Sequence, residues 1–403
     1  MDRDEGRPDA HGISRARLAL AAFLSRPAVR AVTRRLRPVA KVLLLLFIAW
    51  VGVGVLTVSI IEVGCRGGPA PRVSPPRPPA RTQLTANVPD YARPEEDTYL
   101  SYPEWYIVWS YQEKAAFQAT HLPSGFPYFG AIGQYWSGYC AVNRLVQGRY
   151  PFNVGDHLML VVIGTSFTVE YALKAAYENT VGRVSEWLSS HQPVEEDAYA
   201  YRVAQQYADF VLVRPFYEFS FFKHVTGLWR ETHLWGPHFA RKVERKLFLS
   251  LDYGVEAFYC ELIELATHLT FGVAGTDTYA WIEHAGDSAF AANPHVRRVR
   301  ALGRDSFLVI IPRYQEFTPT AMSLAQRGVR FTEIAGNEDI VVSVLAPRSF
   351  AWDLDQGKPL FAADVLTKPQ VERIVLQAPV PSLHALLAAL RRHGLEVEHI
   401  YDY

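Results

Sequence analysis

The pattern of apolar and polar residues divides this chain into three regions. In the first, residues 42–61 read VLLLLFIAWVGVGVLTVSII and contain no charged side chain. Twenty helical residues rise about 30 Å, which is the thickness of the hydrocarbon core of a bilayer. The apolar part of a cleaved signal peptide is shorter, roughly 7 to 15 residues. The pattern therefore predicts a single N-terminal transmembrane helix.

The distribution of charged residues predicts the orientation of this span in the membrane. The tail before it, residues 1–41, carries eight basic and no acidic residues between Arg15 and Lys41. Basic residues collect on the cytoplasmic side of membrane proteins. We therefore predict a single-pass protein of the cell (inner) membrane, with a basic cytoplasmic tail and the bulk of the chain outside the cytoplasm. The bilayer itself is the first expected partner.

A proline-rich linker, residues 62–94, follows the predicted span. Between Arg66 and Arg81 it contains six prolines in sixteen residues. Such segments favour the extended polyproline II conformation and act as semi-rigid spacers. The linker is predicted to be a stalk between the membrane and the first folded domain.

The second region, residues 95–275, has the 3.6-residue period of helices and is rich in aromatic side chains. The sequence Ser101-Tyr102-Pro103-Glu104 is typical of a capping box and predicts a helix start. Positions at helical spacing form a largely aromatic stripe, for which a core role is expected: Tyr102, Trp105, Tyr106, Trp109, Glu113 and Phe117. Further helices are predicted from about Asp156, over 198–213 and over 239–270.

Charged residues at four-residue spacing recur on two of these predicted helices. Glu170, Lys174 and Glu178 are interpreted as a salt-bridged outer face, and the uncharged run 158–169 before them as a buried core helix, since twelve residues are too short to cross a bilayer. A ladder of Asp252, Glu256, Cys260, Glu264 and His268 recurs in the last helix. A solvated face is the favoured interpretation of that ladder as well.

Candidate metal ligands occur in the same region. The residue types that bind metals are present, but without the His-Glu-x-x-His or Glu-x-x-His spacing of known sites. The weak candidates are His224, Glu231, His233, His238, Glu264 and His268. No catalytic residue or cofactor is identified. Aromatic residues from Phe221 to Phe248, interleaved with the basic cluster 241–246, also suit a membrane interface, with ordinary packing as the alternative.

The third region, residues 279–403, changes to the short apolar runs of strands. Strands are predicted over 296–302, 306–314, 329–335, 339–346, 371–380 and 395–403, with helices after Thr318 and Pro381. Gly336-Asn337 is a turn signal between two of the strands. Two strand-helix-strand units in this order resemble a ferredoxin-like α+β sandwich. The fold class predicted for the whole chain is therefore α+β.

Composition limits the function that these regions suggest. With 41 basic and 41 acidic residues the chain is not expected to bind nucleic acid. Cys140 and Cys260 could form a disulfide or remain buried thiols, and lipidation of Cys65 is disfavoured by Glu62. The sequence predicts an extracytoplasmic binding, scaffolding or envelope-accessory protein, with an envelope protein or a lipid as further partner. The alternative is a metal-assisted hydrolase or another enzyme, with its site in the helical region.

Overall fold

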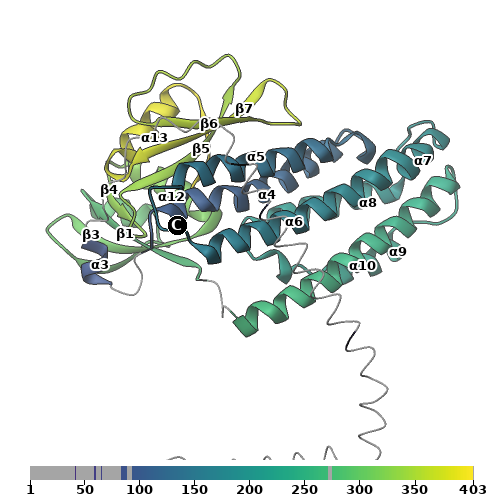
Figure 1. Cartoon of the computed structure of the whole chain (residues 1–403), viewed down its shortest axis with the longest axis horizontal. Coiled ribbons are helices and arrows are strands. Elements are labelled where there is room, and N and C mark those ends of the chain that lie inside the picture. Colours follow the sequence, from purple (N-terminus) through teal and green to yellow (C-terminus); the bar gives the residue numbers. More distant parts are fainter. Residues whose placement is uncertain are drawn as a thin grey trace, which may run out of the picture. The chain divides into compact units, whose positions relative to one another are not determined.

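The computed structural model describes Lys41, Ser59, Cys65 and residues 83–88, 93–270 and 275–402. The chain divides into two compact units, Met1–Val63 and Gly64–Tyr403, and all helices and strands named here belong to the second. The predicted basic tail and transmembrane span lie outside the described residues, apart from Lys41 and Ser59. The second unit combines a group of helices with two antiparallel sheets, so the predicted α+β class is confirmed (Figure 1).

The helical part occupies the first half of this unit. One continuous helical stretch, 154–188, contains α6, a π-helical turn at Glu178–Gly182 and α7. The helices are α3 (Gln83–Asn87), α4 (Glu96–Gln118), α5 (Tyr128–Val146), α6 (Val154–Tyr177), α7 (Arg183–Leu188), α8 (Glu195–Val211), α9 (Phe221–Glu231) and α10 (Phe239–Thr270).

Most helix boundaries follow from local signals in the sequence. The side chain of Asn153 accepts a hydrogen bond from the Asp156 amide and caps α6 near the predicted start. The predicted helix 239–270 coincides with α10. The predicted start of α4 at Ser101 is wrong, because the helix begins at Glu96 and contains Pro103 in its interior. The Ser101 hydroxyl donates to the Asp97 carbonyl inside the helix and does not cap it.

The first four residues of the predicted stripe of α4 are buried, whereas Glu113 and Phe117 are only partly buried, and the stripe joins the helices to the second sheet. Tyr102, Trp105, Tyr106 and Trp109 are each at most 6% exposed. The Tyr102 ring lies 5.0 Å from that of Phe361, and other stripe residues pack on neighbouring helices. Because rings of one helix contact both parts, the helices and sheets share a continuous interior and form one compact unit.

The strands form two separate four-stranded sheets and not one. The first, ordered β2-β3-β1-β4, and the second, ordered β6-β7-β5-β8, are antiparallel throughout. Their strands are β1 (Asp277–Glu283), β2 (Arg297–Ala301), β3 (Ser306–Pro312), β4 (Arg330–Ile334), β5 (Asp339–Pro347), β6 (Lys358–Asp364), β7 (Val371–Pro379) and β8 (Glu396–Ile400). Three helices accompany them, α11 (Asp287–Ala292), α12 (Phe317–Gln326) and α13 (Leu383–Arg392).

The turn predicted at Gly336-Asn337 exists, but it does not make a hairpin within one sheet. β4 pairs with β1, whereas β5 pairs with β7 and β8. Ala335 and Gly336 both have positive φ, which lets the chain leave the first sheet and enter the second. One apolar core then runs through both sheets and includes α12 and α13. The segment 358–364, expected to be part of a loop, is the edge strand β6.

Candidate functional site

A polar cavity lies inside the helical part, between α4, α6, α8 and α10. Its volume is about 60 Å³, which leaves room for a few water molecules. Ionisable side chains line it from three helices: Lys114 of α4, Glu170 and Lys174 of α6, and Asp252 and Glu256 of α10. Charged groups are rarely buried without partners. The contacts among these side chains therefore determine the chemistry of the site.

Lys174 is the centre of this charge cluster. Its Nζ donates to Glu170 Oε1 at 2.7 Å. The same nitrogen lies 3.2 Å from Asp252 Oδ1 and 3.4 Å from Glu256 Oε1. One ammonium group therefore faces three carboxyl groups. A second cation, Lys114, lines the same cavity, so the cluster is close to neutral when one of the three carboxyl groups is protonated.

The surroundings shift the pKa values of two of these groups toward neutral pH. Burial, followed by the negative charge of Glu170, raises the pKa of Glu256 to about 7. Burial, followed by the positive charge of Lys174, lowers the pKa of Lys114 to about 8. The cavity can therefore take up or release protons close to neutral pH. Within the part of the chain that the structure describes, this is the chemistry the site supports most directly.

The sequence interpretation of these residues as outer faces is wrong. Lys174 and Glu178 are 9% and 2% exposed. They continue the inner stripe of α6 at helical spacing, after Leu160, Gly164, Phe167 and Tyr171, which are all buried. This continuation of an apolar stripe by charged residues was a signal that the sequence contained. On α10, Asp252 and Glu256 likewise face the interior and not solvent.

A second network of buried charges shares Glu178 and Arg245 with the lining of the cavity. Arg245 Nη1 donates to Glu178 Oε1 at 2.8 Å, and Arg241 Nη2 donates to Asp197 Oδ1 at 3.0 Å. Both arginine side chains are at most 2% exposed. The Lys246 ammonium donates to the Thr232 carbonyl at 2.9 Å. The basic cluster 241–246 is therefore buried, which excludes it from the surface role considered for it.

The structure does not bring the predicted metal candidates together. Among the described residues, no three His, Cys, Asp or Glu side chains are grouped as metal ligands would be. Exposed His233 contacts exposed Glu195, and exposed Glu231 pairs with Arg202. The remaining candidates are dispersed: His224 is half-buried and stacks on Phe219, His238 and Glu264 are exposed, and the His268 side chain lies outside the described part.

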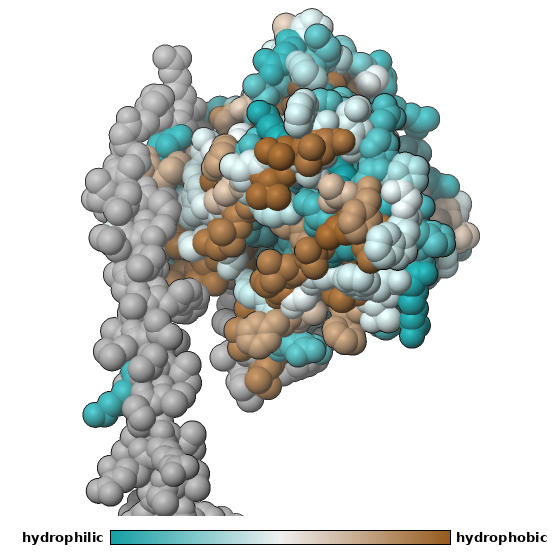
Figure 2. Space-filling view, turned by 90° about the vertical axis from the view of Figure 1, so that its right-hand side faces the viewer, coloured by the Kyte–Doolittle hydropathy of each residue, from teal (hydrophilic) through white to brown (hydrophobic). Residues whose placement is uncertain are grey.

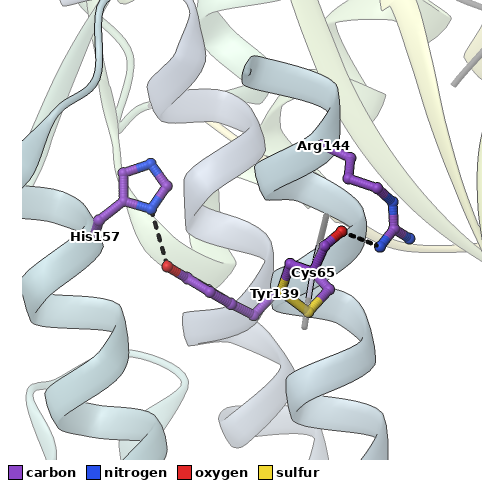
Figure 3. The surroundings of a disulfide bond; sticks show 5 residues. Cys65, Tyr139, Arg144 and His157 are labelled. Carbon is purple, nitrogen blue, oxygen red and sulfur yellow. Dashed lines mark hydrogen bonds between the residues drawn. A yellow bond between two sulfur atoms is a disulfide. The ribbon is translucent and has the colours of Figure 1, made fainter. Parts of the chain in front are cut away.

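A disulfide joins Cys65 to Cys140 of α5 (Figure 3). Arg144 donates to the Cys65 carbonyl, and Tyr139 is hydrogen-bonded to His157 of α6 in the same region. Of the pairings considered, Cys140 with Cys260 is therefore wrong, and Cys260 is a buried free thiol. The predicted proline-rich linker lies outside the described residues, apart from Cys65, residues 83–88 and residues 93–94.

The outer surface of the helical part is unusually apolar. Among the described residues, the stretch Val154–Leu188 is long and apolar enough to cross a membrane by length and composition, although 33% of its most apolar window is buried. This is weak evidence for membrane association, because core helices can have the same composition. Figure 2 faces the end of the unit where α7 lies and shows apolar residues gathered there. Exposed side chains at this end include Val184, Trp187 and Leu188.

Comparison with known proteins adds no relative: no family model matches this chain, and neither a curated protein nor a solved structure matches it.

Proposed function

We propose that this chain is a membrane-anchored protein whose Gly64–Tyr403 unit acts outside the cytoplasm in binding or scaffolding at the cell envelope. The disulfide between Cys65 and Cys140 carries this proposal. Structural disulfides persist in oxidising compartments and are rare in the cytoplasm. This location agrees with the direction predicted from the basic tail and the uncharged run 42–61.

The two sheets support a binding role through their topology. In our interpretation, each is a ferredoxin-like module. The first has the chain order β1-α11-β2-β3-α12-β4 and the sheet order β2-β3-β1-β4. The second repeats this sheet order, with α13 in the place of α12 and the segment 348–357 in the place of α11. The proposal is thus a tandem pair of related modules, a fold that many binding proteins use but that identifies no activity by itself.

Nothing in the described residues favours the alternative of a metal-assisted hydrolase. Among the described residues its candidate ligands form no group that could hold a metal ion, and the cavity contains lysines among its carboxylates. An ammonium group competes with a metal ion for the same oxygen atoms. The binding or scaffolding role is therefore the better supported proposal.

A topology experiment tests this function class. The full chain is fused after Tyr403 to a reporter enzyme that is active only outside the cytoplasm, and its cysteines are mapped by mass spectrometry without reduction. We expect an active reporter and a linked pair of peptides containing Cys65 and Cys140. A Cys260→Ala variant is the matched control and should keep both results. An inactive reporter with Cys65 and Cys140 as free thiols would contradict the proposal.

A further inference from the structure

An exposed apolar stripe runs along most of α10. Its members recur every three or four residues and are between 52% and 69% exposed: Leu247, Leu251, Val255, Phe258, Leu262 and Leu265. From Phe239 to Phe258 every exposed residue of this helix is uncharged. Nineteen helical steps correspond to about 28 Å of helix length. The basic residues of the same segment, Arg241 to Lys246, point inward.

The neighbouring helix α6 extends this apolar surface. Its exposed residues are also uncharged and include Leu158, Val169 and Leu173. Tyr259 of α10 donates to Ser166 of α6, while Phe248 stacks on Tyr177. Residue numbers therefore rise on one helix as they fall on the other, so the two helices are antiparallel.

Both exposed sets lie on the same side of this helix pair. On each helix the exposed residues are about a quarter turn from the residues that contact the other helix, at about 100° per residue. Because the helices are antiparallel, a quarter turn in the same rotational sense on each of them points to the same side of the pair. The combined surface of Leu158, Val169 and Leu173 with Leu247, Leu251, Val255 and Phe258 is called the α6–α10 face below.

The polarity of these helices is the reverse of that of a helix at a water surface. Amphipathic helices of soluble proteins bury their apolar side and expose their charges. Here Lys174, Glu178 and Arg245 are buried, and the α6–α10 face is exposed. Inward charges with apolar residues outside are the arrangement that a hydrocarbon environment favours. The occupant of this face is therefore apolar.

We propose that the α6–α10 face docks against the hydrocarbon of the bilayer in which the chain is anchored. This inference rests on the proposed anchoring. The predicted span ends at Ile61, and four extended residues from there to Cys65 reach at most about 14 Å. The disulfide attaches Cys65 to α5, so the proposed anchor would be joined to the helical part by a short length of chain. Three exposed tryptophans, the residues that prefer membrane interfaces, lie in the same part of the molecule, namely Trp187, Trp229 and Trp235.

Spin labels on the α6–α10 face report directly whether lipid, water or protein contacts it. The full chain, in a Cys260→Ala background, is labelled at Leu251→Cys on α10 or at Leu173→Cys on α6 and reconstituted into phosphatidylcholine–phosphatidylglycerol vesicles. The matched control is Ala388→Cys, an exposed position on α13. Power-saturation measurements then compare collisions with oxygen, which concentrates in hydrocarbon, and with a water-soluble nickel chelate.

For both face positions we expect high oxygen and low nickel accessibility, and the reverse for the control. High nickel accessibility at Leu251 and Leu173 would overturn the inference, since the face would then be in water. Low accessibility to both reagents would also overturn it, because a protein surface such as a second copy would cover the face. Carbonate extraction of the same vesicles separates this test from the anchoring: a chain that resists extraction keeps its anchor whatever the labels report.

Discussion

The helical part and the sheet part of this protein differ in what they bury and in what they expose. In the sheets, one apolar core fills the interior. Among the described residues, every exposed large apolar side chain except Val299 belongs to the helical part, and that part also buries most of the ion pairs. The sheet part thus buries nearly all of its large apolar side chains. The helical part pairs charges in its interior and exposes apolar side chains, for which we propose an apolar neighbour.

The largest expected effect comes from breaking an interior ion pair of the helices. Arg245→Met leaves Glu178 buried without its cation, and we expect a loss of about 3–5 kcal/mol in the free energy of unfolding, measured by denaturant titration. Arg202→Met, which removes an exposed pair with Glu231, is the matched control and should cost less than about 1 kcal/mol. Equal losses in the two variants would show that the buried network does not hold the helices together.

A slightly smaller effect is expected from the sheet core. Leu386 of α13 is fully buried, so Leu386→Ala should lower the free energy of unfolding by about 2–4 kcal/mol through lost contacts and a cavity. Leu251→Ala on α10 loses few protein contacts and should change it by about 0.5 kcal/mol or less. Denaturant titration of both variants checks the contrast. A large loss for Leu251→Ala alone would place the helical part's core on its outer face.

The smallest expected effect tests how the cavity contributes to the pH dependence of stability. In the folded protein the pKa of Glu256 is raised from 4.5 to about 7, so folding favours its protonated form. The stability that this group contributes is complete below about pH 4.5 and is lost as pH rises through about 7. Glu256→Gln should remove this loss, so the stability advantage of the variant over the parent should grow by on the order of 2–3 kcal/mol from pH 5 to pH 8.

Other buried acids titrate in the same pH range, so the experiment must compare the variant with the parent at each pH. The pKa values of Asp97 and Asp402 are also raised to about 7, mainly by burial. Only the difference between parent and variant stability therefore reports Glu256. Parallel stability curves for the two proteins from pH 5 to pH 8 would remove Glu256 from the pH response.

The sequence predicted the elements of this fold better than their partners. Spacing and capping residues are local signals, so the bounds of α10, most strands and the buried aromatic stripe of α4 could be predicted. Partners depend on the whole chain. The signal at Gly336-Asn337 indicated a turn, but it could not show that β4 and β5 join different sheets. The pairing of Cys65 with Cys140 likewise depends on the tertiary structure.

The candidate site was missed for a related physical reason. Charged residues at four-residue spacing on a helix are usually solvated, so the general rule favoured an outer face for Lys174 and Asp252. The continuation of the α6 apolar stripe into Lys174 and Glu178 was the stronger signal. Ion pairs between helices offset the free-energy cost of burying these charges. One sequence does not show which residues form these pairs.

One measurement tests most directly whether the helical part contacts lipid in addition to its predicted anchor. A protease site replaces residues 62–64 in the full chain, the protein is reconstituted into vesicles, and it is cleaved before flotation in a density gradient. We predict that the fragment from Cys65 onward still floats with the vesicles, and that Leu251→Glu with Phe258→Glu releases it. Recovery of the unsubstituted fragment at the bottom of the gradient would contradict the account, because the anchor would then be the sole membrane contact.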